Sequence, residues 1–437
     1  MADSDQKTVG LLYGKTGMEV TVPASAVVLE GRPPGPVADA AAAVRAALAE
    51  PIGAAPLAEL LAAKRPGTVA VTVSDITRPV PNGDFLPPML EVLNAAGVDD
   101  SRIVVIIGTG MHRSSTDEER EALVGPGVAS RVEVIDHVAA DAESLVRVSD
   151  DPPVSVCRRF AEADFRIVTG FIEPHFMAGF SGGRKGVCPA LVDLATIGRF
   201  HGHEALADPR ADSGVLEGNP CHEIALAVAK AVGVDFLFNV ALSRDRKIAG
   251  VYCGDLEAAH LAGCRDVAEW ATATVDGPFD LVVTSGGGHP LDATFYQTVK
   301  GMCGALPALG PESHLLIASE CPEQLGSPAF TELMAKWSGD WQGFLADITA
   351  HPERTELDQW EFQMQSRVLA RIGMDRLHLV SGGMPPVTQR HIGVSPVLGE
   401  GSAAARANAF IIGFLDEHPE ARVAVIPDGP YTMLRAG

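Results

Sequence analysis

Six apolar runs, most of them rich in valine or isoleucine, recur along the 437-residue chain, and many lead into a glycine-rich or polar loop. Near-continuous runs of this kind are typical of strands that are covered on both faces, as in parallel sheets. The sequence therefore predicts parallel strands at residues 68–73, 103–107, 165–168, 281–283, 314–318 and 422–426.

Helical patterns separate these runs. Residues 38–50 are rich in alanine, and the pattern stops at Pro51, which cannot continue a helix. Residues 86–96 follow the first apolar run, and residues 256–270 and 357–372 form longer amphipathic patterns. Because strand and helix patterns alternate, the chain is predicted to be an α/β protein with two Rossmann-like, doubly wound domains.

The best candidate for a domain boundary is the loop at residues 275–278, because an α/β pattern restarts after it. We therefore expect an N-terminal α/β domain at residues 1–275, which carries the candidate lysine and histidines described below, and a C-terminal α/β domain at residues 276–437. The last helix and strand could pack back on the first domain. Ligands of doubly wound folds bind beyond the C-terminal ends of strands, so the active site is expected in the cleft between the domains.

The composition narrows the class of partner. The formal net charge of −22 argues against nucleic acid, whose phosphates require a basic surface. The N-terminus lacks a basic start followed by an apolar stretch, and no run approaches the roughly 18 apolar residues of a membrane-spanning helix. The seven cysteines are scattered and form no CxxC pair, which favours reduced thiols. We expect a cytoplasmic protein that binds neither nucleic acid nor membrane.

The most informative motif runs from Glu173 to Lys185, with the sequence EPHFMAGFSGGRK. Histidine is the side chain best suited to move protons near neutral pH. A lysine beside a compact Gly-Gly turn can form a covalent bond to a cofactor or hold its phosphate. His175 could instead be a turn residue and Lys185 a surface residue, but two glycines between Phe180 and the Arg-Lys pair favour a function.

Two further loops follow apolar runs. Asp75, Thr77 and Arg78 offer a carboxylate, a hydroxyl and a guanidinium group to a phosphate or carboxylate, or they cap the next helix. The sequence GTGMHR brings His112 to a second loop, where a lone histidine is more often structural. This sequence is not a GxGxxG nucleotide motif.

The downstream pair His201 and His203 could chelate a metal, since imidazole suits nickel, zinc and copper. In the second predicted domain, a glycine-rich loop leads into Tyr296, Gln297 and Lys300. On a helix, Tyr296 and Lys300 would share a face, and a helix start with Gln297 and Lys300 would bind a carboxylate. The alternative is an ordinary amphipathic helix start.

Together, these segments resemble the nickel-pincer nucleotide-dependent lactate racemase family, which comprises 2-hydroxy acid racemases and epimerases. The resemblance runs from Asp75 to Trp360 in order and with near-constant spacing. Its most specific part is the string Gly-Phe-Ser-Gly-Gly-Arg-Lys at residues 179–185. Trp360 itself is either a core residue or a wall for a flat cofactor.

The resemblance implies a nickel-bound pyridinium-3,5-bisthiocarboxylic acid mononucleotide, covalently linked to Lys185 and built by separate cofactor-synthesis proteins. It implies that His201 completes the nickel coordination and that His112 and His175 are the proton donors and acceptors. His201 is preferred to His203 because it lies sixteen residues after Lys185, although Phe200 replaces the polar residue that often precedes it. The implied cofactor contacts are Asp75, Ile76, Thr77 and Arg78. The implied substrate contacts are Arg78, Tyr296, Gln297 and Lys300.

The implied activity is inversion of C2 of a small 2-hydroxy acid, with transient hydride transfer to the pyridinium ring. Lactate, malate, an aromatic hydroxy acid and a sugar acid are all compatible substrates. A nicotinamide-dependent dehydrogenase would require a GxGxxG with a following acidic residue, and neither stands in the expected context. A pyridoxal-phosphate racemase would not require histidines on both sides of one lysine. A non-catalytic cofactor carrier would not require both His112 and His175, so catalysis is favoured.

Overall fold

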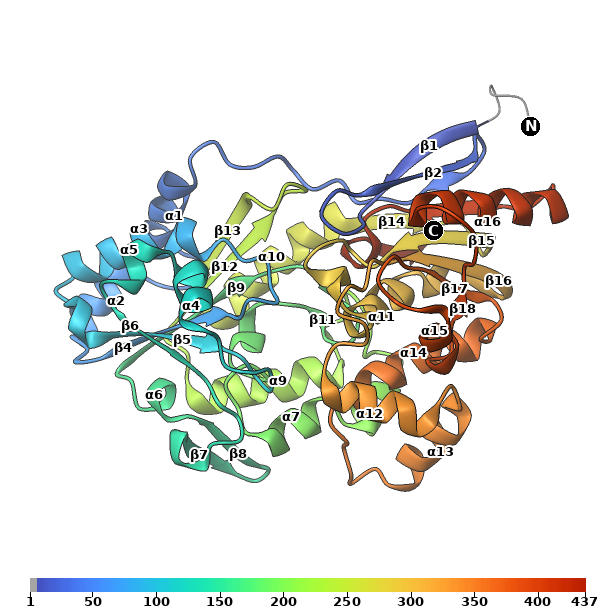
Figure 1. The fold of residues 1–437 in the computed structure, drawn as a ribbon. Helices are drawn as coiled ribbons and strands as arrows, with labels where there is room; N and C mark the ends of the chain where they lie inside the picture. Colours follow the sequence, from blue (N-terminus) through green and yellow to red (C-terminus); the bar gives the residue numbers. More distant parts are fainter. Residues whose placement is uncertain (1–5) are drawn as a thin grey trace. The chain divides into compact units, whose positions relative to one another are not determined.

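A computed structural model of the protein describes residues 6–437, which form two compact units (Figure 1). The Lys185 unit comprises Pro33–His201 and Asp208–Trp270. The C-terminal unit comprises the described residues up to Arg32 together with Gly202–Ala207 and Ala271–Gly437. Each unit is therefore assembled from segments that are separate in the sequence, unlike the contiguous domains 1–275 and 276–437 expected above.

The Lys185 unit contains a six-stranded sheet in the order β13-β12-β9-β4-β5-β6. All neighbouring strands run parallel except β12 and β13, which are antiparallel. The central strands are almost wholly buried, as the aliphatic runs predict. The strands are β4 (Val69–Ser74), β5 (Ile103–Gly108), β6 (Glu133–Asp136), β9 (Phe165–Phe171), β12 (Phe236–Leu242) and β13 (Ile248–Gly254).

Helices pack against this sheet and bury its apolar core residues. Helix α1 (Ala40–Ala49) begins where the Asp39 carboxylate accepts a hydrogen bond from the Ala42 amide, and it packs on α3 (Asn82–Ala95) and β13. The rings of Phe85 and Phe238 lie 4.9 Å apart in the core between α3 and the sheet. The other helices of this unit are α2 (Leu57–Lys64), α4 (Asp117–Val124), α5 (Pro126–Ala129), α6 (Arg158–Ala161), α7 (Leu194–Phe200), α9 (Pro220–Val232) and α10 (Leu256–Ala271).

Two short antiparallel ribbons complete the Lys185 unit. One pairs β7 (Leu145–Asp150) with β8 (Pro153–Cys157). The other pairs β10 (Pro174–His175) with β11 (Gly179–Phe180), and His175 lies opposite Gly179. This second ribbon follows β9 directly, so the sheet places it at the carboxyl end of a central strand.

The C-terminal unit contains a second six-stranded sheet in the order β18-β17-β16-β15-β19-β3, and every pair in it is parallel. The predicted α/β fold with Rossmann-like sheets is thus confirmed, and the first sheet differs from a purely parallel one only in its antiparallel strand β13. That the active site lies in a cleft between two domains stays a prediction. The strands are β3 (Val27–Val28), β15 (Phe279–Ser285), β16 (Leu309–Ala318), β17 (Leu377–Val380), β18 (Ser395–Pro396) and β19 (Val423–Ile426).

Both ends of the described chain belong to this unit. Strand β3 pairs with β19, and β20 (Met433–Ala436) pairs with β14 (Thr272–Val275). The hairpin of β1 (Gln6–Leu11) and β2 (Met18–Pro23) packs against α16 (Ala403–Glu417). The last helix and strands therefore stay with the C-terminal sheet, which settles the alternative that the sequence left open.

Helix α14 (Gln359–Ile372) confirms the predicted helix at 357–372. Its polar residues, however, are not all exposed as an amphipathic pattern would suggest. Its polar residues Gln359, Glu361 and Gln365 are buried together with its apolar ones. These residues are buried because α14 packs against several neighbouring elements at once. Buried polar groups need hydrogen-bond partners, and the Gln365 side-chain amide donates to the Ile392 carbonyl at 2.7 Å. The unit's other helices are α8 (His203–Ala207), α11 (Phe295–Gly304), α12 (Pro328–Trp337), α13 (Trp341–Ala350) and α15 (Pro386–His391).

Within residues 6–437, no helix combines the length and the apolar character that crossing a bilayer demands.

Candidate active site

The loops after β4 and β5 bring Asp75 and His112 together. These strands are parallel and in register, with Ser74 opposite Gly108, so both loops leave the same edge of the sheet. The Asp75 carboxylate contacts the His112 ring, with Oδ2 2.6 Å from Nδ1. Its other oxygen accepts a hydrogen bond from the Thr77 hydroxyl at 2.6 Å. Helix α3 is capped by Pro81 without a side-chain bond, so Asp75 and Thr77 do not serve as its cap.

The charge state of Asp75 decides the tautomer of His112. Burial raises the pKa of the Asp75 carboxyl, but the hydrogen bond and charge of His112, the Thr77 hydroxyl and the Arg78 guanidinium outweigh it, and the pKa is lowered overall. An ionised carboxylate only accepts hydrogen bonds, so Nδ1 of His112 must be the donor. Nε2 of this exposed side chain then has a free lone pair when the ring is neutral.

The predicted His175 and Lys185 form a second close pair. His175 is buried in the β10–β11 ribbon, and its Nε2 lies 2.9 Å from Nζ of Lys185. Lys185 lies in the 3-10 turn Gly183–Gly186, and its Nζ is 5.2 Å from the centre of the Phe200 ring. The long motif at 173–185 thus places an imidazole against the candidate anchor amine.

The Gly-Gly turn before Lys185 has a packing explanation. Gly183 has φ +55°, and a Cβ atom there would lie 2.5 Å from the His260 ring. A Cβ on Gly182, whose φ is +72°, would lie 2.6 Å from Oδ1 of Asn239. The glycines therefore let buried neighbours approach the backbone closely, in addition to any role toward a ligand.

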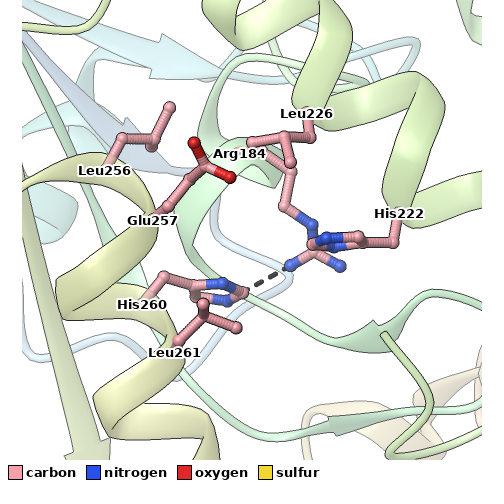
Figure 2. Close-up of a pocket in the computed structure, with 7 residues that line it drawn as sticks. All are labelled: Arg184, His222, Leu226, Leu256, Glu257, His260 and Leu261. Carbon is pink, nitrogen blue, oxygen red and sulfur yellow. Dashed lines mark hydrogen bonds between the residues drawn. The ribbon is translucent and has the colours of Figure 1, made fainter. Parts of the chain in front are cut away.

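Arg184, between the glycines and Lys185, is almost fully buried. Burial lowers its pKa to about 10. Figure 2 shows its guanidinium group beside His260, with Nη1 3.2 Å from the His260 Nε2, at a small pocket. The pocket volume of about 20 Å³ suffices for roughly one water molecule and excludes a substrate. The residues that line it are Arg184, His222, Leu226, Leu256, Glu257, His260 and Leu261.

His201 ends α7 and is suited to bind a metal. Its Nδ1 lies 3.1 Å from the Ile197 carbonyl oxygen, which can only accept, so Nδ1 carries the proton and Nε2 the lone pair. Burial and the positive charge of Lys185 lower its pKa to about 3, and the charge of His112 adds to this effect. The ring is therefore neutral near pH 7.

The rival His203 belongs to the C-terminal unit, where its Nε2 lies 3.3 Å from the Thr349 hydroxyl. Across the part of the chain that the structure describes, no three His, Cys, Asp or Glu side chains gather in a group that could hold a metal ion.

The predicted substrate contacts of the second domain lie on α11. This helix begins at Thr294, whose hydroxyl accepts a hydrogen bond from the Gln297 amide, and Tyr296 and Lys300 lie one turn apart on it. The Tyr296 hydroxyl accepts a hydrogen bond from Nε1 of buried Trp360 at 2.6 Å. Lys300 is also buried. The predicted helix is confirmed, and Trp360 supports Tyr296 from α14.

Comparison with known proteins shows the family to which the chain belongs. The family model of the lactate racemase N-terminal domain matches residues 13–214, and that of the lactate racemase C-terminal domain matches residues 275–433. The chain belongs to the lactate racemase family. The resemblance that the motifs indicated is therefore confirmed, and membership places the chain among racemases, a class of isomerases.

Two relatives that are named lactate racemases align with nearly the whole chain. A lactate racemase of Thermoanaerobacterium thermosaccharolyticum is 32% identical over 396 residues, which are 90% of each protein. One of Lactiplantibacillus plantarum is 34% identical over 393 residues, 88% of this chain and 89% of the relative.

Solved structures agree on the fold. The lactate racemase apoprotein from T. thermosaccharolyticum has a TM-score of 0.87 and 30% identity, with 98% of this chain and all of that chain covered. A Thermotoga maritima protein with 17% identity and a TM-score of 0.67, aligned over 94% of this chain and all of its own, shares the fold.

Replacing His201 should change the pH dependence of folding in protein without cofactor. The pKa of His201 is about 3 in the folded state and about 6.5 when unfolded, so below pH 6.5 the unfolded state gains a proton that the folded state lacks. At pH 5 this costs about 2 kcal/mol of stability. Between pH 7 and pH 5, the free energy of unfolding of the wild-type protein should therefore fall by about 2 kcal/mol more than that of His201→Gln.

Urea unfolding at both pH values measures this difference. His351→Gln, at an exposed position, controls for the substitution itself. An unchanged loss of stability in His201→Gln would show that His201 is not held neutral by the fold.

Proposed function

We propose that this protein racemises lactate by using a nickel-pincer pyridinium mononucleotide attached to Lys185. The contact that carries the proposal is the 2.9 Å approach of His175 to Lys185, a proton-transfer group beside an amine in the family's most specific motif. The relatives from T. thermosaccharolyticum and L. plantarum are both named lactate racemases, which supports lactate as the substrate.

The chemistry of a 2-hydroxy acid explains why such a cofactor is needed. The C2–H bond lies next to an ionised carboxylate and is only weakly acidic, so direct proton abstraction is difficult. When bound, the nickel-pincer nucleotide supplies an electron-poor pyridinium ring that can take a hydride from C2 and return it. The protein side chains have to move the hydroxyl proton, hold the carboxylate and hold the planar 2-keto acid between the two steps.

The residues of the Lys185 unit fit this cofactor. An amine can form the covalent link through Nζ of Lys185, and the neutral His201 ring offers a lone pair of the kind that suits nickel. The remaining nickel ligands would be the sulfur-containing arms of the cofactor. Ile76, with its exposed side chain, and Thr77 and Arg78 stay the predicted cofactor contacts.

Asp75 is better explained by His112 than by the cofactor. Both of its carboxylate oxygens are engaged, one by His112 and one by Thr77. The carboxylate holds the His112 ring with its Nδ1–H directed at Asp75, so that Nε2 can take the hydroxyl proton of the substrate. His175 would serve the opposite face, because inversion exchanges the two sides of the planar keto acid.

Four residues are proposed to bind the substrate. Lys300 and Arg78 carry positive charge for the carboxylate, and charge-assisted hydrogen bonds of this kind are stronger than neutral ones. Gln297 and Tyr296 add an amide and a hydroxyl group on α11, where Trp360 fixes the Tyr296 hydroxyl.

The covalent link can be tested by intact mass and metal analysis. Protein made in cells that contain the cofactor-synthesis proteins should carry an added mass on Lys185 and about one nickel per chain. Lys185→Arg keeps the charge but cannot form the link, so it should lack the added mass. An unmodified Lys185 in wild-type protein with bound zinc would contradict the proposal.

The two histidines can be tested by assaying conversion of L-lactate to D-lactate and the reverse. General acid–base catalysis contributes about 10²- to 10⁴-fold, so His112→Gln and His175→Gln should each lose at least about 100-fold in both directions. Each variant should still carry the adduct on Lys185. Full activity of either variant in both directions would refute the two-histidine assignment, and malate and aromatic hydroxy acids in the same assay test the choice of lactate.

Replacing Asp75 by asparagine tests its assignment to His112. An amide can donate to Nδ1 of His112 and so favour the wrong tautomer, which predicts a loss in kcat of about 100-fold or more with the adduct retained. Thr77→Ala removes only the second hydrogen bond of Asp75 and should have a smaller effect. Loss of the adduct in Asp75→Asn at unchanged turnover per loaded enzyme would assign Asp75 to the cofactor instead.

A further inference from the structure

Arg184 carries a buried positive charge for which its neighbours supply no negative partner. The residue is only 1% exposed, and its pKa of about 10 leaves the guanidinium group charged at neutral pH. Across residues 6–437, its side chain contacts two backbone carbonyls and one imidazole and forms no ion pair with a carboxylate. A buried charge without a counter-charge is costly, so this arrangement requires an explanation.

The hydrogen bonds of the Arg184 side chain use only part of its capacity. Nη2 donates to the Ala178 carbonyl at 2.6 Å, and Nη1 donates to the Gly182 carbonyl at 3.3 Å. Nη1 also lies 3.2 Å from Nε2 of His260. Nε is buried and has no hydrogen-bond partner within the described chain. Because a guanidinium N–H group can only donate, Nε still requires an acceptor.

Nearby thiols do not supply the missing negative charge. The groups that favour the charged form of Arg184 are cysteines, among them Cys188 and Cys264. Burial raises the pKa of both thiols to about 12, so both stay protonated and neutral near pH 7. The charge of Arg184 is therefore not balanced by a thiolate.

The small pocket beside Arg184 has a second group without a partner. Figure 2 shows the guanidinium group together with the rings of His222 and His260, which also line the pocket. Nδ1 of His222 is buried and, among the residues that the structure describes, has no hydrogen-bond partner. Burial lowers the pKa of His222 to about 4 and that of His260 to about 3, and the charge of Arg184 adds to both effects. Both rings are neutral near pH 7, so Arg184 is the charged member of this group.

Glu257 is the one carboxylate among the residues that line the pocket, and it is paired elsewhere. Its Oε1 lies 2.7 Å from Nζ of Lys230, and the two side chains are 43% and 54% exposed. The two charges of this partly exposed pair offset each other. The buried part of the pocket therefore keeps the positive charge of Arg184.

We propose that this pocket binds a monatomic anion such as chloride, held by the unpartnered donors of Arg184 and His222. Its volume of about 20 Å³ admits roughly one particle of the size of a water molecule, which suits chloride better than phosphate, sulfate or a carboxylic acid. A water molecule could accept the same hydrogen bonds, but it would not balance the charge. The anion keeps the guanidinium group bonded to the Ala178 and Gly182 carbonyls, in the segment that leads to Lys185.

Crystals of the full-length protein grown in sodium bromide can locate the anion directly. The site requires neither nickel nor the pyridinium cofactor, so protein made without the cofactor-synthesis proteins is suitable. Bromide replaces chloride and should give an anomalous difference peak between Arg184 and His222. A pocket that holds only water in these crystals would overturn the proposal.

Urea unfolding measures whether the anion stabilises the fold. At constant ionic strength, sodium chloride or bromide should stabilise the protein relative to sodium gluconate, whose anion is too large for the pocket. A ligand that binds only the folded state stabilises it by RT ln(1 + [L]/Kd), so each tenfold rise in chloride well above Kd should add about 1.4 kcal/mol. A bromide peak without this stabilisation would indicate an adventitious ion only and would also overturn the proposal.

Substitutions at the pocket separate specific binding from a general salt effect. His222→Phe keeps a ring but has no donor, so the Kd for chloride should rise about 10-fold or more, because one hydrogen bond to a charged group is lost. His351→Phe makes the same change at an exposed position and should respond to chloride as the wild-type protein does. An equal chloride response in wild-type protein and His222→Phe would refute the site.

Arg184→Met removes the charge itself and should abolish the chloride response. This variant also loses the hydrogen bonds to Ala178 and Gly182, so it is expected to be less stable in every salt. If it does not fold, the comparison of His222→Phe with His351→Phe decides the question.

Discussion

The parallel pairing of β4 with its two neighbours is the constraint on which the candidate site depends. Because Ser74 lies opposite Gly108, the loops that carry Asp75 and His112 leave the sheet at the same edge. Strand β9 pairs with the other side of β4, and the chain that follows it carries His175 and Lys185. A shift of one residue in either pairing would turn the buried side chains to the opposite face, so the core fixes the site geometry.

Burial and charge act against each other within this site. The Asp75 carboxylate is buried, which alone would favour its neutral form, yet hydrogen bonds from His112 and Thr77 keep it ionised. The positive charge of Lys185 adds to burial in keeping His201 neutral. The same surroundings thus maintain one charged acceptor and one neutral imidazole, the two states that the proposed acid–base chemistry and the proposed nickel binding respectively require.

Features that depend on local sequence were predictable, and features that depend on distant contacts were not. The aliphatic runs predicted the strands because burial on both faces imposes a local pattern. The Asn219-Pro220 pair signals a helix start, but nothing in it indicates that Asn219 also bonds to Met177, 42 residues earlier. Likewise, the polar residues of α14 predicted an exposed face, whereas several of them are buried against neighbouring elements.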